Sequence, residues 1–177
     1  MKKLIYLMAI LVTCLACDSK KSLQEYLVEK ENSTEFISAS LPTSLLFQNL
    51  DTLSSKQNQS LRKIEKINLL ALTESKGKAL LEKERTELKS VLNQPSYESL
   101  LNFNSGGKEA KLLFVGSENE IDELIFFGYD SEMGMLLLRM RGNDVNADDI
   151  YQITQSAQQM DVNMLSGVFG DLVGEME

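Results

Sequence analysis

The sequence predicts an α+β fold in which helices pack on one face of a mainly antiparallel sheet. Two observations lead to this class. Beyond Pro95 the chain has four strand-like runs separated by turns short enough for hairpins, and before Pro95 it has a helical pattern with leucines on one side. With 177 residues, of which 43% are hydrophobic, the chain can bury a core without disulfides or metals. We therefore expect one folded domain.

The first half of the chain alternates between helix and strand signals. Ser22 and Glu25 have the spacing of a capping box, which predicts a short helix. Residues 76–93 form the clearest amphipathic pattern and end before Pro95, so they predict the longest helix. The other assignments are strands over 36–41 and 67–72, helices over 43–53 and 61–66, and a polar surface loop over 51–60.

The second half predicts an antiparallel meander followed by a helix. Its strands are 97–103, 111–115, 124–129 and 135–141, and the helix begins near Asn146. Three of these strands are apolar without alternation, so both faces of the sheet need a cover. We expect the chain's own terminal segments, including an amphipathic stretch over 161–177, to supply it. A partner protein or a second copy is the alternative.

The amino terminus has the three regions of a secretory signal peptide. Lys2 and Lys3 precede an apolar run over 4–16, which a small residue closes before the polar residues 18–21. The run is shorter than the roughly 20 residues that a membrane-spanning helix needs. We therefore expect export of the chain.

The end of this signal is similar to the lipobox of bacterial lipoproteins, in which a cysteine becomes the lipidated first residue. Ala16 precedes Cys17 as in that motif, although Cys14 occupies the place where Leu is usual. Cys14 is the competing site, but the bulky Thr13 precedes it. Cys17 is thus the predicted lipidation site, and two or more acyl chains would anchor the domain stably. An ordinary cleaved signal with incidental cysteines is the alternative.

These observations divide the chain into four parts. The expected parts are a lipoprotein signal over 1–17, a tether with a short helix over 18–34, the α+β domain over 35–160 and the amphipathic, glycine-containing segment over 161–177.

Composition excludes several classes of chemistry. The chain has no His, and both cysteines lie in the first 17 residues, so imidazole-dependent catalysis and His or Cys zinc sites are not expected. Removing the residues before Cys17 leaves 16 basic residues against 26 acidic ones, a net charge of −10. Such a surface disfavours nucleic acid. We expect no catalytic residue, no cofactor and no metal.

Two acidic groups are weak candidates for a site. Asp144, Asn146 and Asp148 have the spacing of the first ligands of an EF-hand loop, but Asp149 replaces the required glycine and Gln155 the final glutamate. A helix cap explains the same residues and is the preferred interpretation.

The second group lies in a predicted turn. Glu118, Glu120 and Asp122 could bind a hard cation or act as acid and base, although a solvated turn is the preferred interpretation.

The lipobox-like start, the Leu-rich helix, the hairpin strands and the closing run MLLLRMRGNDV over 135–145 occur together. This layout resembles an uncharacterised lipoprotein family of Bacteroidota, domain of unknown function 4252, over most of residues 35–160. The resemblance implies the cell envelope of a diderm bacterium and transfers no active-site residues.

The leading hypothesis is a lipid-anchored, non-enzymatic protein of the inner or outer membrane, with its body in the periplasm or at the cell surface. Its expected partners are the membrane, through the lipid, and another protein or a second copy. The alternative is a hydrolase of envelope glycans that uses two carboxyl groups.

Overall fold

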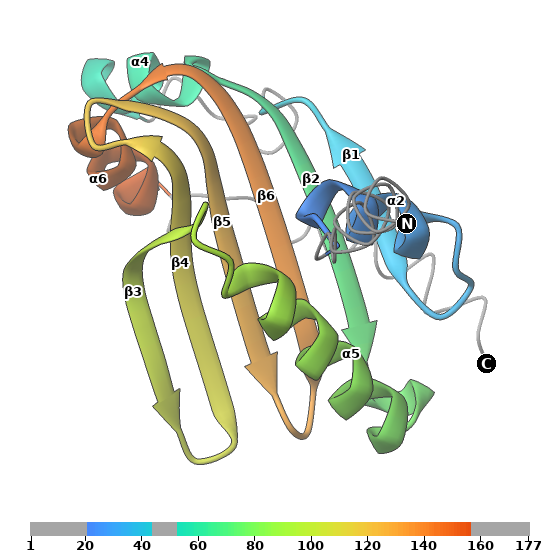
Figure 1. Cartoon of the computed structure of the whole chain (residues 1–177). Helices are drawn as coiled ribbons and strands as arrows, with labels where there is room; N and C mark the ends of the chain where they lie inside the picture. The colour runs from blue at the N-terminus through green and yellow to red at the C-terminus, as the bar shows by residue number, and fades with distance from the viewer. Residues whose placement is uncertain (1–20, 44–52, 157–177) are drawn as a thin grey trace, which may run out of the picture.

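The computed structural model describes residues 21–43 and 53–156 (Figure 1). Within them, a six-stranded sheet has the order β1-β2-β6-β5-β4-β3, and all neighbouring strands are antiparallel. The α+β class is therefore confirmed. The elements are α2 (Leu23–Glu31), β1 (Ile37–Leu41), α4 (Ser55–Arg62), β2 (Ile64–Thr73), η2 (Glu74–Lys76), α5 (Lys78–Leu92), β3 (Glu98–Ser105), β4 (Lys108–Ser117), β5 (Glu120–Asp130), β6 (Gly134–Val145) and α6 (Ala147–Ser156).

The last four strands form the predicted meander, because each is joined to the next by a tight turn. Gly106 and Gly107, which connect β3 to β4, have φ values of 59° and 79°, the conformation that a two-residue hairpin turn requires. The other two strands join the far side of the meander. β2 pairs with β6 along nearly its whole length, and β1 pairs with the outer side of β2.

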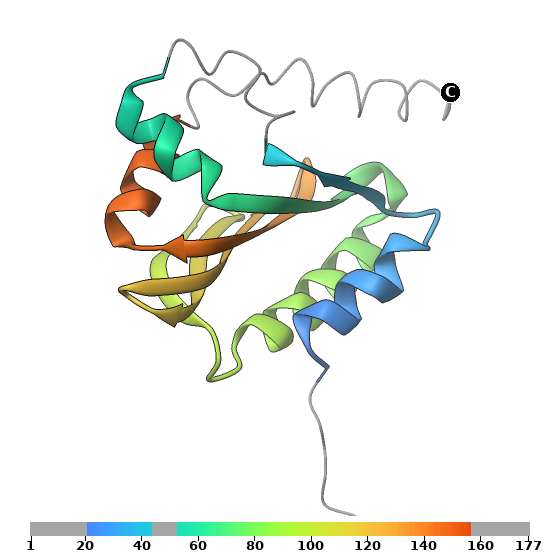
Figure 2. The same ribbon diagram turned by 90° about the horizontal axis from the view of Figure 1, so that it is seen from above.

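Helices α2 and α5 cover one face of the sheet, as Figure 2 shows from above. Their apolar sides meet side chains that point to this face from the four central strands. The side chains there that are no more than 1% exposed are Leu23, Tyr26, Leu70, Leu72, Leu81, Leu88, Leu92, Ile125, Phe127 and Leu137. This layer is the main core, and it confirms the predicted packing of helices on one face.

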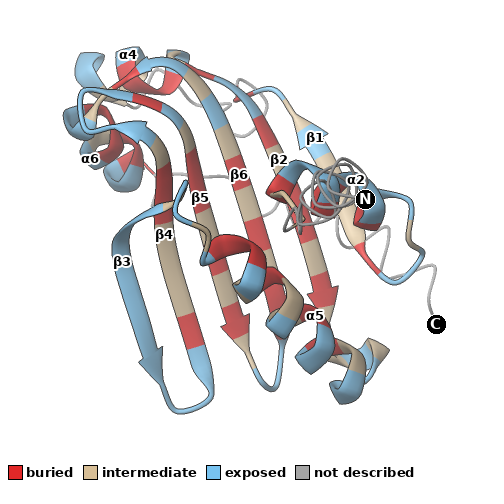
Figure 3. Ribbon diagram, viewed as in Figure 1, coloured by how far each residue is buried: buried red, intermediate tan, exposed pale blue. Residues whose placement is uncertain are grey.

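The opposite face is also apolar, and helices α4 and α6 cover one end of it (Figures 2 and 3). Leu124 and Ile125 are consecutive on β5 and therefore point to opposite faces, yet both are buried. The second cluster consists of Leu61, Ile64, Ile67, Phe114, Ile121, Leu124, Val145, Ile150 and Ile153. Burial on both faces explains why the strands do not alternate with polar residues. The expected cover from residues 161–177 lies outside the described residues.

Two assignments in the first half of the chain are wrong. Residues 55–60, expected in a loop, belong to helix α4, whose capping box joins Ser54 to Gln57. The short helix expected over 61–66 is not a separate element, because its first two residues are the end of α4 and β2 begins at Ile64. The polar composition of α4 concealed it, since this helix buries only Ser60 and Leu61. Most of the helix expected over 43–53 lies outside the described residues.

Leu137 tests how strongly the main core depends on the helix layer. Its side chain is fully buried on β6, so Leu137→Ala should lower the free energy of unfolding by about 2–5 kcal/mol. Met133→Ala is the control, because Met133 is 74% exposed, and it should change stability little. Urea denaturation measures both. Equal, small effects would show that the helices pack loosely on the sheet.

Candidate functional site

Helix α2 places the folded domain directly after the predicted lipidation site. Cys17 lies outside the described residues, but Lys21 is only four positions further on. The side-chain amide of Gln94, after α5, donates to the Lys21 carbonyl oxygen at 2.7 Å, and the Lys21 ammonium pairs with Glu29 and Glu87. The short helix expected within residues 18–34 is α2, and it belongs to the main core.

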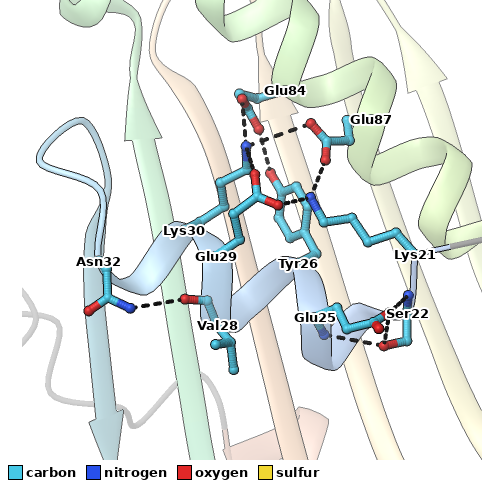
Figure 4. Close-up of polar contacts among 10 residues, drawn as sticks. All are labelled: Lys21, Ser22, Glu25, Tyr26, Val28, Glu29, Lys30, Asn32, Glu84 and Glu87. Carbon is cyan, nitrogen blue, oxygen red and sulfur yellow. Dashed lines mark hydrogen bonds and ion pairs between the residues drawn. The ribbon is translucent and has the colours of Figure 1, made fainter.

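A buried ion pair holds α2 against α5 (Figure 4). The Lys30 ammonium lies 2.9 Å from Oε1 of Glu84, and the Tyr26 hydroxyl donates to Oε2 of the same carboxylate at 3.1 Å. The Glu84 side chain is 2% exposed and that of Lys30 is 9% exposed. Sequence analysis missed Glu84, although it interrupts the apolar side of α5, between Leu81 and Leu88, and this interruption was the available signal.

The surroundings of this pair shift the pKa values of Lys30 and Tyr26. Burial by itself would lower the pKa of Lys30, but hydrogen bonds to Glu84 and Glu29 and the charge of Glu87 raise it. Burial and the adjacent negative charge of Glu84 raise the pKa of Tyr26, so its hydroxyl keeps the proton that it donates. Tyr26, Lys30 and Glu84 stabilise the contact between α2 and α5, since each polar atom that they bury has a hydrogen-bond partner.

The cation candidates do not converge on one point. Asp144, with φ 56°, is exposed near the end of β6, and Asp148 pairs with Lys56 on the surface at 3.3 Å. Asn146 caps α6: its side-chain oxygen accepts from the amide of Asp149 at 3.0 Å, which confirms the helix-cap interpretation. Among residues 21–43 and 53–156, no group of three metal-ligating side chains could hold an ion.

Asp149 accepts more of the hydrogen bonds near this cap than any of the three candidates. Sequence analysis considered it only as a substitution in a calcium loop. Its carboxylate accepts hydrogen bonds from Ser60 and Lys63, both at 2.7 Å, and from the backbone amide of Asn146 at 3.0 Å. Burial raises its pKa, but Lys63, Ser60 and Asn146 outweigh that effect and the pKa is lowered. Asp149 therefore ties α6 to α4. The Asn-x-x-Asp spacing of a reciprocal cap was the signal for it.

The acidic turn is exposed to solvent. Glu118, Glu120 and Asp122 are exposed at the connection between β4 and β5, and none of them lines either of the two hollows beside α2 and β1. The next acid, Glu123, behaves differently. Its carboxylate accepts from two nitrogens of Arg139, a residue that is 8% exposed and also donates to Gln24 of α2. This ion pair thus belongs to the contact between sheet and helices.

Comparison with protein-family models identifies the family of the chain. The model of the domain of unknown function DUF4252 matches residues 26–153, which span the whole sheet and most of α2 and α6. The chain belongs to the DUF4252 family. The resemblance seen in the sequence is therefore confirmed for the family. Comparison with curated proteins and with solved structures gives no match.

The most exposed element of this DUF4252 domain is strand β3, at one edge of the sheet. All eight of its residues are exposed, and Figure 3 shows the strand in a single pale colour. Leu100, Leu101 and Phe103 are 47%, 50% and 50% exposed, and they are half of the large apolar side chains exposed in the described part of the chain. We call residues 98–105 the β3 edge. An edge strand of this kind presents unpaired backbone groups and apolar side chains to solvent, and another strand can pair with such an edge.

The Glu84 carboxylate should contribute to stability mainly through Lys30. Glu84→Gln leaves the ammonium with Glu29 and Glu87 alone, so we expect a loss of about 1–3 kcal/mol in urea denaturation, less than for a fully isolated buried charge. Adding Lys30→Met to Glu84→Gln should recover part of this loss. Glu31→Gln, at an exposed position of α2, is the control. A double variant no more stable than Glu84→Gln would contradict the assignment.

Asp149 should make the DUF4252 domain sensitive to acid. Its folded pKa is lowered below the ordinary 3.8, so its contribution is complete above that pH and is lost as the pH falls through the folded value. The difference in unfolding free energy between the natural chain and Asp149→Asn should therefore shrink below about pH 4.

The matched control is Asp148→Asn, because Asp148 is exposed beside the same helix cap. Denaturation curves at pH 7 and at pH 3 measure the effect. An Asp149→Asn difference that is the same at both pH values would contradict the lowered pKa.

Proposed function

We propose that this protein is a lipid-anchored protein of the cell envelope in a diderm bacterium, whose domain serves as a non-enzymatic binding module. The observation that carries the proposal is the short connection between the lipobox-like cysteine and the fold. Four residue steps separate Cys17 from Lys21, which limits their Cα atoms to a separation of roughly 14 Å. Acyl chains on Cys17 would thus hold the domain at the membrane surface.

The contacts of α2 suit this role. A force applied to the amino terminus acts first on Lys21, which is held by the hydrogen bond from Gln94 and the ion pair with Glu87. Further along α2, the buried Lys30–Glu84 pair also resists it. The load therefore passes into α5 and the main core. Among residues 21–43 and 53–156, no helix is long and apolar enough to cross a bilayer.

The β3 edge supports the binding part of the proposal. It is uncharged from residue 99 to residue 105, although a quarter of the whole chain is charged, and its exposed apolar side chains can be covered by a partner. The alternative of a glycan hydrolase needs two carboxyl groups facing each other across a cleft. Glu118, Glu120 and Asp122 project from a turn, and no described contact favours that alternative.

Cys17→Ala tests the anchor. The natural chain should fractionate with membranes and dissolve only in detergent, and its mass should exceed that of the polypeptide from Cys17 onward by the mass of its acyl chains. Cys17→Ala should lose both properties. Cys14→Ala is the control and should keep them, since Cys14 lies in the segment expected to be removed. Membrane association and mass unchanged by Cys17→Ala would overturn the proposal.

A further inference from the structure

The backbone of the β3 edge offers unpaired hydrogen-bonding groups at defined positions. The two-residue turn at Gly106 and Gly107 makes Ser105 and Lys108 a hydrogen-bonded pair, and such pairs alternate along an antiparallel ladder. Phe103 therefore bonds to β4, whereas the N–H and C=O groups of Asn102 and Asn104 point away from the sheet. These are the groups that a further strand would use.

The side chains of the β3 edge are arranged for a partner of the same kind. Leu101 pairs with Leu112 and Phe103 with Ala110, so both point to the face of the sheet that α4 and α6 cover only at one end. If a second β3 strand is antiparallel and centred on Asn102, Leu101 of each copy lies opposite Phe103 of the other. One two-fold axis then brings four exposed apolar side chains into contact as two cross-strand pairs.

Charge repulsion between two copies is smallest at the β3 edge. The chain has a net charge of −8, so most of its surface repels another copy of itself. The β3 edge is an exception, since Glu98 is its only charged residue and would face the uncharged Gly106 of the second copy. Edge strands normally carry lysine, proline, inward charges or a β-bulge that prevents such pairing. The register of β3 shifts between Ser99 and Leu101, but residues 101–105 pair with β4 without interruption and contain no lysine, proline or charge.

We propose that two copies of this protein associate through their β3 edges, as an antiparallel pair about Asn102 that continues the sheet from one copy into the other. This proposal deepens the binding role proposed above by naming a second copy as the partner. The other edge is less suitable: β1 has five residues, of which only Ser40 is exposed. Pairing through one strand gives a small interface, so the dimer should form reversibly and benefit from confinement to a membrane.

A charge exchange at the two-fold axis tests the pairing. Two full-length copies with different affinity tags are produced together, extracted in detergent, and purified through one tag while the other is measured. Natural copies should be captured together. Asn102→Lys in both copies, or Asn102→Glu in both, should reduce capture at least about tenfold, because like charges meet across the axis.

The decisive combination has Asn102→Lys in one copy and Asn102→Glu in the other, which should restore capture. Asn119→Lys, at an exposed position of the β4–β5 turn, is the control and should not reduce it. Urea denaturation confirms that each variant is folded. The proposal is overturned if natural copies are not captured together, if Asn102→Lys in both copies leaves capture unchanged, or if the mixed pair is not restored. Membrane fractionation of the same samples tests the anchor separately.

Discussion

A sheet that is apolar on both faces is the constraint on which the rest of this structure depends. β5 and β6 carry large apolar side chains at consecutive positions, and each face must be removed from water. The chain meets this requirement with two helix pairs that come from distant parts of the sequence. α2 and α5 cover the first face, and α4 and α6 cover one end of the second. The two features on which the proposals rest are consequences of this arrangement.

The first consequence concerns the amino terminus. Since α2 is needed to cover the first face, the chain enters the core almost as soon as the lipobox-like segment ends. Buried charges secure this entry, because Lys30 reaches Glu84 across the contact between α2 and α5, and Arg139 reaches Gln24 and Glu123 from beneath the helices. In the proposed lipoprotein, the element nearest the membrane is therefore a packed helix rather than a flexible spacer.

The second consequence concerns the opposite end of the sheet. β3 is the last strand of its side, and it pairs only with β4 among the strands. The same second face that makes α4 and α6 necessary continues onto β3 through Leu101 and Phe103, where both residues are half exposed. A surface of this kind is a liability for a protein that must stay apart from others, and it is useful for one that must associate. The proposed anchor and the proposed docking surface thus follow from one sheet with two apolar faces.

The sequence by itself determined the features that depend on neighbouring residues. The meander, the helix before Pro95, the Ser22–Glu25 cap and the Asn146 cap are all encoded within a few positions, and the structure contains each of them. The family could also be recognised from the layout of these elements. Helix α4 was not predicted, because its sequence is almost wholly polar and its buried side contains only one leucine.

Only the tertiary structure decided which charges are buried and which strand is left at an edge. Glu84, Asp149 and Arg139 look like ordinary surface residues in the sequence, yet each meets a partner more than 50 positions away. The placement of β2 beside β6, which leaves β3 exposed, likewise joins segments about 70 residues apart. Such pairings arise from competition among all surfaces of the chain for burial, and no local pattern of residues records the outcome of that competition.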